Sequence, residues 1–458
     1  MGKSSDMKST AAVEEALARI DEIDSSGYEL NSVLALDESA LARAAEFDKE
    51  STSLPLQGAP ILIKDNIEAI GLPATAGSFA LNNTPIVKDS PIAERLRRAG
   101  AVIVGSTNLS EWANIRSTKS TSGWSALGGL TANPWKHRHS AGGSSSGSGA
   151  AVAAGLTKWA IGSETDGSII CPSSLNGCVG IKPTVGLIPR DGMIPISSSQ
   201  DSPGPMTQTV AQAALLLDVL SDRNEYFGVT QSENAIKVGV VREWMSADAQ
   251  VSALFEDSLS KLEKTGITLV KVELTPPGEE ESDDELMVLL YELNRDLGIY
   301  LQGRSGAKVR SLQEVVEFNL TYSTTELQHF GQELFDKALE FADLHEEYQR
   351  ARARNKTWAE KTLAQGLANA DVLIGCTYGP AWPSTLGEGD NFGAATWITT
   401  APSIAGTPIG TIPMGLVDGL PVGLGFVSGR NQEGKLISAM NKAERALDLG
   451  ILKPTHLK

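Results

Sequence analysis

The chain is poor in the residues that disulfide frameworks and metal sites require. Its 458 residues include only three cysteines and five histidines. Cys171, Cys178 and Cys376 show no C-x-x-C spacing, which predicts reduced thiols in a cytoplasmic protein. His137 and His139 are the closest histidine pair, but no third ligand or glutamate-bearing helix motif accompanies them. We therefore expect no metal site.

Long apolar runs and an excess of basic residues are also missing. No apolar run approaches the ~18 residues of a membrane-spanning helix. Residues 1–6 contain no apolar stretch of signal-peptide length. Acidic residues outnumber basic ones by 56 to 39, a net charge of −17, and no basic stripe with interleaved aromatic residues is present. We expect neither a membrane anchor nor a nucleic-acid partner.

The apolar residues that are present alternate between strand-like and helix-like spacing. Hydrophobic residues make up 41% of the chain, which is enough for a large core. The predicted strands are 59–63, 101–105, 236–241 and 267–274, and the predicted helices are 11–23, 39–50 (opened by Asp37), 92–99, 210–220 and 251–265. This alternation predicts a single α/β/α domain over residues 1–458, in which helices flank a large twisted mixed sheet.

The pattern changes in the second half of the chain. Residues 276–281 read as a polar turn, and the capping-box pair Ser282 and Glu285 predicts the start of a mainly helical stretch, 282–368. Strand-like sequence returns within 371–458, at 371–375 and 408–426, before a closing helix at 433–447. Because sheet-like segments flank the helical stretch, we interpret that stretch as an insertion or cap on the one domain.

Two glycine- and serine-rich stretches, 142–149 and 162–168, place small hydroxyl groups on backbone that can adopt unusual dihedral angles. Such turns can bind anions around a nucleophile. The first stretch contains a G-x-S-x-G match centred on Ser145, but loop-like residues 133–140 stand where a nucleophile elbow needs a strand. No Gly-Lys-Ser/Thr follows for a phosphate loop. A pure binding loop stays open as an alternative.

Lysine is the best candidate for a general base, because no histidine has a convincing context. Lys64 ends the apolar strand 59–63. Loss of solvent there would disfavour the ammonium and could leave a neutral amine. The alternative is a lysine that extends from a strand end to the surface.

The ordered combination of motifs is more specific than any one of them. Residues 64–66, 142–147 and 162–168, with Ser144 and Ser168 spaced 24 residues apart, resemble the amidase signature family of Ser-Ser-Lys hydrolases. The signature core spans about 58–210, and further similar segments are Pro172, 176–177, 180–186, 202–206 and 421–424. Asp166, where others have glycine, and residues 109–114, 122–126 and 379–383 are most similar to the bacterial peptide amidase branch.

The resemblance implies a role for each matching residue. Ser168 would be the nucleophile, Ser144 the bridging serine after a cis peptide bond to Gly143, and Lys64 the base. Ile170 stands where many members carry arginine, so an electrostatic contact of the family is absent or replaced. The resemblance also implies an oxyanion hole from the backbone of Thr165, Asp166, Gly167 and Ser168, and substrate contacts at Asn114 and Ser145.

The function implied is a cytoplasmic, cofactor-free amidase that forms an acyl-enzyme. Its expected substrates are C-terminal amides of peptides or small primary amides. Alternatives within the family are an aryl-acylamide or ester hydrolase, or an A-type amidotransferase subunit with a protein partner. From another class, an inactive binding protein is disfavoured by the presence of Lys64, Ser144 and Ser168. A homo-oligomer stays open.

Overall fold

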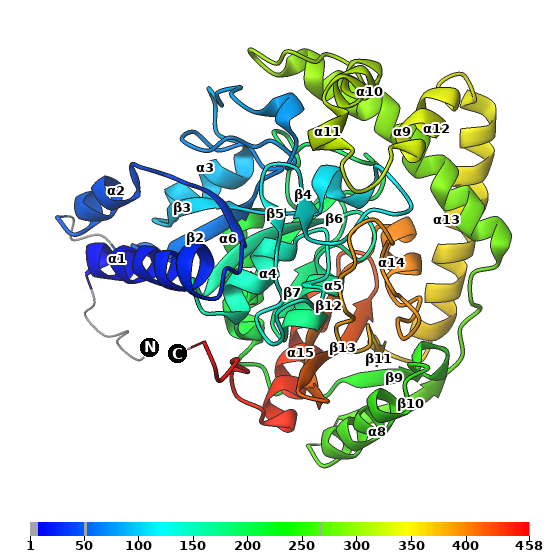
Figure 1. Ribbon diagram of the computed structural model, residues 1–458. Coiled ribbons are helices and arrows are strands. Elements are labelled where there is room, and N and C mark those ends of the chain that lie inside the picture. The colour runs from blue at the N-terminus through cyan, green and yellow to red at the C-terminus, as the bar shows by residue number, and fades with distance from the viewer. Residues whose placement is uncertain (1–7, 50–52, 266, 458) are drawn as a thin grey trace.

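A computed structural model describes residues 8–49, 53–265 and 267–457. Two of the sequence-based expectations fall partly or wholly outside these ranges. One concerns residues 1–6, interpreted above as lacking a signal peptide, and the other the last residue of the helix expected at 39–50. The chain folds into a single α/β domain around a mixed sheet of 11 strands (Figure 1). In sheet order the strands are β1 (Val33–Leu36), β3 (Val102–Thr107), β2 (Pro60–Lys64), β6 (Trp159–Glu164), β8 (Ser202–Thr207), β7 (Val179–Lys182), β12 (Ile409–Val417), β13 (Leu420–Ser428), β11 (Val372–Cys376), β9 (Lys237–Val241) and β10 (Thr268–Val272).

Parallel and antiparallel pairing divides this sheet into regions. Strand β2 is parallel to both β3 and β6, and β9 is parallel to both β10 and β11. The strands between these two groups pair antiparallel. A separate two-stranded ribbon is formed by β4 (Trp124–Ser125) and β5 (Gly129–Leu130).

Helices cover both faces of the sheet because strand side chains alternate between its two sides. In β2, Ile61 and Ile63 join one hydrophobic core, whereas Leu62 joins the other. The first face is covered by α3 (Pro91–Arg98), α6 (Val210–Ser221), α8 (Ala249–Glu263) and α15 (Glu433–Leu447). The second is covered by α1 (Ser9–Arg19), α2 (Ala40–Phe47), α4 (Ser146–Ala153), α5 (Ile170–Asn176) and α14 (Thr400–Ala405).

Much of the helical stretch between β10 and β11 packs around a hydrophobic cluster that it shares with Ala76, Leu81, Trp112 and Ile194. Figure 1 shows α10, α11 and α12 gathered at the top of the molecule, with α13 running down one side. These elements are α9 (Glu279–Gly303), α10 (Leu312–Thr321), α11 (Ser323–Glu326), α12 (Glu333–Glu340) and α13 (His345–Leu367). Short helical segments elsewhere are α7 (Tyr226–Val229), η1 (Ile20–Gly27), η2 (Phe79–Leu81), η3 (Glu111–Asn114) and η4 (Arg242–Trp244).

The start expected for this helical stretch, at Ser282, is wrong. Helix α9 begins at Glu279, and the N–H of Gly278 donates a hydrogen bond to Glu281 Oε2 at 2.8 Å. Ser282 lies inside the helix and donates to the Gly278 carbonyl at 3.2 Å. Three glutamates in the first turn suit the positive end of the helix dipole, so the acidic run belongs to the helix and not to the preceding turn.

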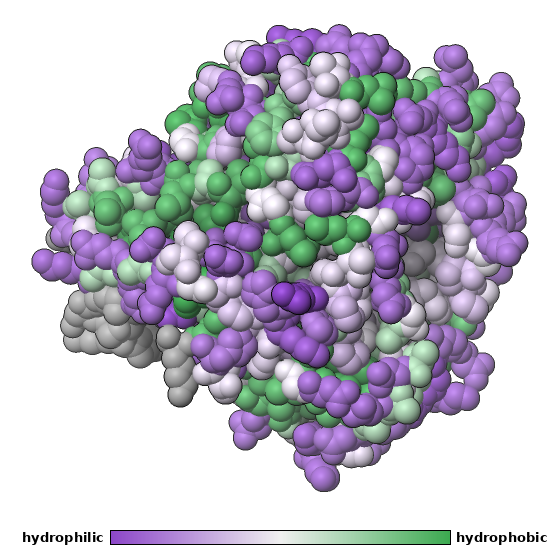
Figure 2. Space-filling view, viewed as in Figure 1, coloured by the Kyte–Doolittle hydropathy of each residue, from purple (hydrophilic) through white to green (hydrophobic). Residues whose placement is uncertain are grey.

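The outer surface carries many hydrophilic side chains (Figure 2). Hydrophilic residues dominate the outer helices on the face drawn in Figure 2. Within the residues described, no helix has the length and hydropathy needed to cross a bilayer.

Candidate active site

The three motifs that the sequence singled out meet at one edge of the sheet. Strands β2 and β6 are parallel neighbours, with Ile63 opposite Ile161, so their carboxyl ends point the same way. Lys64 is the last residue of β2, and the loop 165–168 follows β6 directly. Ser144 lies just before α4, which packs against β6.

Lys64 is fully buried, so the alternative of an exposed strand-end lysine is wrong. Its Nζ donates hydrogen bonds to Ser144 Oγ at 2.7 Å, to Ser163 Oγ at 2.9 Å and to the Ser163 carbonyl at 3.2 Å. Burial lowers the pKa of Lys64 to about 7, although the carboxylates of Asp201 and Glu164 act in the opposite direction. A neutral amine could keep its two N–H bonds to Ser163 and direct its lone pair at the Ser144 hydroxyl.

The first glycine-rich stretch holds two serines with different surroundings. The peptide bond between Gly143 and Ser144 is cis, as the family resemblance implied. The next residue, Ser145, donates its N–H to the Ser168 carbonyl at 3.1 Å and thereby links the two motifs. Its hydroxyl donates to the Ser163 carbonyl at 3.1 Å and accepts from the Ser163 N–H at 3.2 Å. A substrate contact by Ser145 stays a prediction.

The loop after β6 presents backbone donors beside Ser168. Within the described chain, the N–H groups of Asp166, Gly167 and Ser168 have no hydrogen-bond acceptor. The next two N–H groups, of Ile169 and Ile170, are held by Glu164 Oε2 at 2.7 and 2.9 Å. Free donors at this position are what an oxyanion hole requires. No hydrogen bond joins the Ser144 and Ser168 hydroxyls among the residues described.

Thr165 and Asp201 fix the start of this loop. Thr165 Oγ1 donates to Asp201 Oδ1 at 2.6 Å. The other oxygen of Asp201 accepts the N–H groups of Ile196 and Ser197 at 2.9 and 3.0 Å. Burial raises the pKa of Asp201 to about 6. Asp201 therefore connects the oxyanion-hole candidate to the segment before β8.

Gly167 cannot accept a side chain without a rearrangement. Its φ is +79°, and a Cβ there would collide with Tyr378 Oη. We expect Gly167→Ala to lower kcat by about 10²-fold, because displaced N–H groups no longer stabilise the transition-state oxyanion. Steady-state kinetics measures the loss, and thermal unfolding checks the fold. Tyr378→Phe removes the contacted oxygen, so adding it to Gly167→Ala should restore part of the rate. Full activity of Gly167→Ala alone would contradict the placement of the oxyanion hole at Gly167.

Asn114 belongs to a partly buried polar cluster that includes a residue not predicted from the sequence. Asn114 Nδ2 donates to Asp390 Oδ2 at 3.3 Å, and Asn114 Oδ1 is buried without a partner. Asp390 also accepts from the N–H and hydroxyl of Ser122, at 3.2 and 2.7 Å. Burial raises the pKa of Asp390. A substrate contact by Asn114 stays a prediction.

The sequence analysis did not single out three residues that position the site: Ser163, Asp201 and Asp390. Only Ser163 had a sequence signal that could have identified it. Ser163 lies within the second glycine-rich stretch, and strand pairing between β2 and β6 would have placed it beside Lys64. Asp201 and Asp390 carry no such signal, because each reaches the site from a loop distant in sequence.

In the described parts of the chain, no group of three His, Cys, Asp or Glu side chains could hold a metal ion. The histidines and cysteines therefore form no metal-binding arrangement there. His137 packs edge-on against Tyr28, with ring centroids 5.0 Å apart. All three cysteines are buried and free.

Comparisons with known proteins find relatives that match nearly the whole chain. The Amidase family model matches residues 11–437. The crystal structure of the native peptide amidase of Stenotrophomonas maltophilia superposes with a TM-score of 0.90 at 39% identity, covering 99% of this chain and 96% of that chain. A probable amidase of Arabidopsis thaliana is 31% identical over 94% of this chain and 85% of its own. The A-type subunit of the glutamyl-tRNA(Gln) amidotransferase of Exiguobacterium sibiricum is 31% identical over 97% of this chain and 95% of its own.

Proposed function

Because the chain belongs to the amidase family, and is an amide-hydrolysing enzyme of the amidase signature group, we propose that Lys64, Ser144 and Ser168 are its catalytic triad. The observation that carries the proposal is the buried Lys64 amine, 2.7 Å from Ser144 Oγ, with its pKa lowered to about 7. A lysine in water titrates near ~10.4 and would be almost fully protonated at neutral pH.

The proposed reaction is a two-proton relay followed by acyl transfer. Neutral Lys64 takes the proton of Ser144 as Ser144 takes the proton of Ser168, whose Oγ attacks the amide carbon. The backbone N–H groups of residues 166–168 stabilise the oxyanion. The protons return along the same path to the leaving amine, the C–N bond breaks, and ammonia departs from a primary amide. Water, activated by the same relay, then hydrolyses the Ser168 ester and releases the carboxylic acid.

The proposed substrates are C-terminal amides of peptides. Identity is higher to the peptide amidase structure, 39%, than to the amidotransferase relative, 31%. Ammonia release by the purified chain alone, from an N-acylated dipeptide amide, tests this proposal. If ammonia were released only when partner proteins and a charged tRNA are added, the chain would instead be part of an amidotransferase. Faster cleavage of anilides than of peptide amides would favour the aryl-acylamidase alternative.

We expect amide hydrolysis to be independent of metal ions, since the relay needs no metal and the described residues form no metal-binding cluster. Exhaustive treatment with a chelator should leave kcat/KM unchanged. The double variant His137→Ala, His139→Ala should also retain full activity, with at most a modest loss of thermal stability. Activity that disappears with the chelator and returns with zinc would contradict the proposed mechanism.

A further inference from the structure

A pocket of about 370 Å³ lies between α13, the end of α14 and residues 198–200. Three cationic side chains line it: Arg352 and Lys356 from α13, and Arg430 from the turn after β13. Glu360 is its only carboxylate lining residue in the described chain, and it lies 3.7 Å from Lys356. An excess of positive charge in one pocket is unexpected for a chain with a net charge of −17.

Arg430 has no carboxylate partner within the described residues. Its guanidinium instead donates to the carbonyls of Ala405, Gly406 and Val185, each at 3.3 Å. These bonds hold the side chain beside the pocket but leave its charge uncompensated. A fixed guanidinium with a free charge is well suited to binding an oxyanion.

Asn355 adds an unused hydrogen-bond donor to the pocket. It lines the same pocket between Arg352 and Lys356, and only 1% of its surface is exposed. In the described structure its Nδ2 donates no hydrogen bond and is free for a ligand, whereas the buried atom without a partner is Oδ1, an acceptor that an anion does not satisfy. An N–H donor in a pocket that also holds an uncompensated guanidinium suits an oxyanion.

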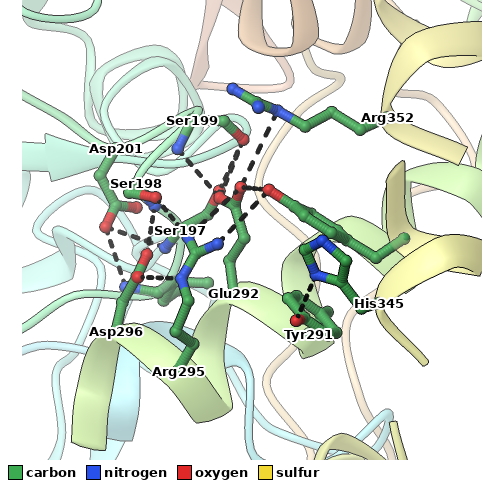
Figure 3. A network of polar contacts seen from close by, with 12 residues as sticks. Ser197, Ser198, Ser199, Asp201, Tyr291, Glu292, Arg295, Asp296, His345 and Arg352 are labelled. Carbon is green, nitrogen blue, oxygen red and sulfur yellow. Dashed lines mark hydrogen bonds and ion pairs between the residues drawn. The ribbon is translucent and has the colours of Figure 1, made fainter. Parts of the chain in front are cut away.

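The wall of the pocket is held by a network centred on Glu292 (Figure 3). Glu292 Oε2 accepts hydrogen bonds from Ser197 Oγ at 2.6 Å and from the Ser199 N–H and Oγ at 2.9 Å. Oε1 accepts from Tyr348 Oη at 2.6 Å and lies 3.9 Å from Arg352 Nε. Figure 3 shows Arg352 and Ser199 reaching this carboxylate from different elements. Glu292 is therefore fully engaged, and it orients Arg352 without neutralising Lys356 or Arg430.

We propose that this pocket binds a small oxyanion of the phosphate or carboxylate type. Arg430 supplies the uncompensated charge, Lys356 and Arg352 line the same pocket beside their partners Glu360 and Glu292, and Asn355 Nδ2 supplies an unused hydrogen-bond donor. The oxyanion could be free phosphate or the carboxylate of a peptide acid, which is also the chemical class of the product of amide hydrolysis. This binding site is additional to the proposed triad and does not depend on it.

Isothermal titration calorimetry tests the proposal. The native chain is titrated with inorganic phosphate and, separately, with an N-acetylated dipeptide acid, at ionic strength held constant with sodium chloride. We expect saturable binding of at least one anion, and competition between the two if both bind. Saturation by phosphate alone would identify the phosphate-type ligand, and saturation by the peptide acid alone the carboxylate.

Matched variants distinguish a site from general attraction to cations. Lys356→Gln and Arg430→Gln should each weaken binding at least tenfold. Arg350→Gln is the control, because Arg350 lies on the same helix but outside the pocket and pairs with Glu346 and Glu347 at 3.5 and 3.0 Å. Lys356 is exposed, so its replacement should not prevent folding. The absence of saturable binding by either anion, or equal affinities in Lys356→Gln and Arg350→Gln, would overturn the proposal.

Discussion

The Ser168→Ala variant is expected to lose at least ~10⁴-fold in turnover while it keeps its fold, since removal of a nucleophile leaves only binding and oxyanion stabilisation. The hydroxyl lies at the carboxyl end of β6, beside N–H groups that have no acceptor among the described residues. Its loss removes one polar atom and no apolar packing. Ammonia release from a peptide amide measures the effect, and thermal unfolding of both proteins provides the control.

Covalent labelling identifies the nucleophile independently of rate. A fluorophosphonate should modify Ser168 in the native chain, and mass spectrometry of its peptides should find no adduct in Ser168→Ala. The neighbouring candidates differ in environment. The Ser145 hydroxyl is engaged by the backbone of Ser163, and burial raises the pKa of the Cys171 thiol. An adduct on Ser145 or Cys171 in the native chain would show that the nucleophile is assigned wrongly.

Lys64→Ala is expected to lower kcat/KM by about 10³-fold, because loss of a general base typically costs 10² to 10⁴. The native enzyme should also show a characteristic pH profile. Below about 7 the amine is protonated and cannot accept a proton, so activity should rise as pH increases through about 7 and level off above it. Measurement of kcat/KM from pH 5 to 9 tests both expectations.

Two lysines give this experiment its controls. Lys158→Ala removes an exposed lysine just before β6 and should leave both rate and profile unchanged. Lys182 is the other fully buried lysine among the described residues, and burial lowers its pKa to about 8. Its Nζ donates to the Thr407 carbonyl at 2.7 Å and not to a catalytic serine. An active Lys64→Ala enzyme whose rate still rises near pH 7 would show that the base lies elsewhere.

The sequence predicted the fold best where apolar periodicity was strong. The helix expected at 433–447 is α15, Glu433–Leu447. The strand-like stretch 408–426 is instead two strands, β12 and β13, joined at Asp418 and Gly419, whose φ values of +51° and +78° suit a tight hairpin. This Asp-Gly pair was a readable turn signal. Strand β8 was harder to foresee, because Pro203 and Pro205 lie within it and proline usually excludes a central strand.

For the site, local sequence predicted which residues carry chemistry but not what surrounds them. The apolar residues before Lys64 left its burial open, because a lysine at a strand end can also extend to the surface. The oxygens that contact it depend on the pairing of β2 with β6, and the partners of Thr165 and Asn114 depend on Asp201 and Asp390. Contacts between distant loops leave no periodic trace in a single sequence.

The alternation in β2 also limits how this region of the chain can change during evolution. Lys64 is in phase with Leu62, whose core contains α4, and out of phase with Ile61 and Ile63. Insertion or deletion of one residue within β2 would reverse every side chain after it. The amine would then enter the core beneath α6 and α15, on the opposite side of the sheet from Ser144. A change of length within β2 is therefore far less tolerable than a substitution.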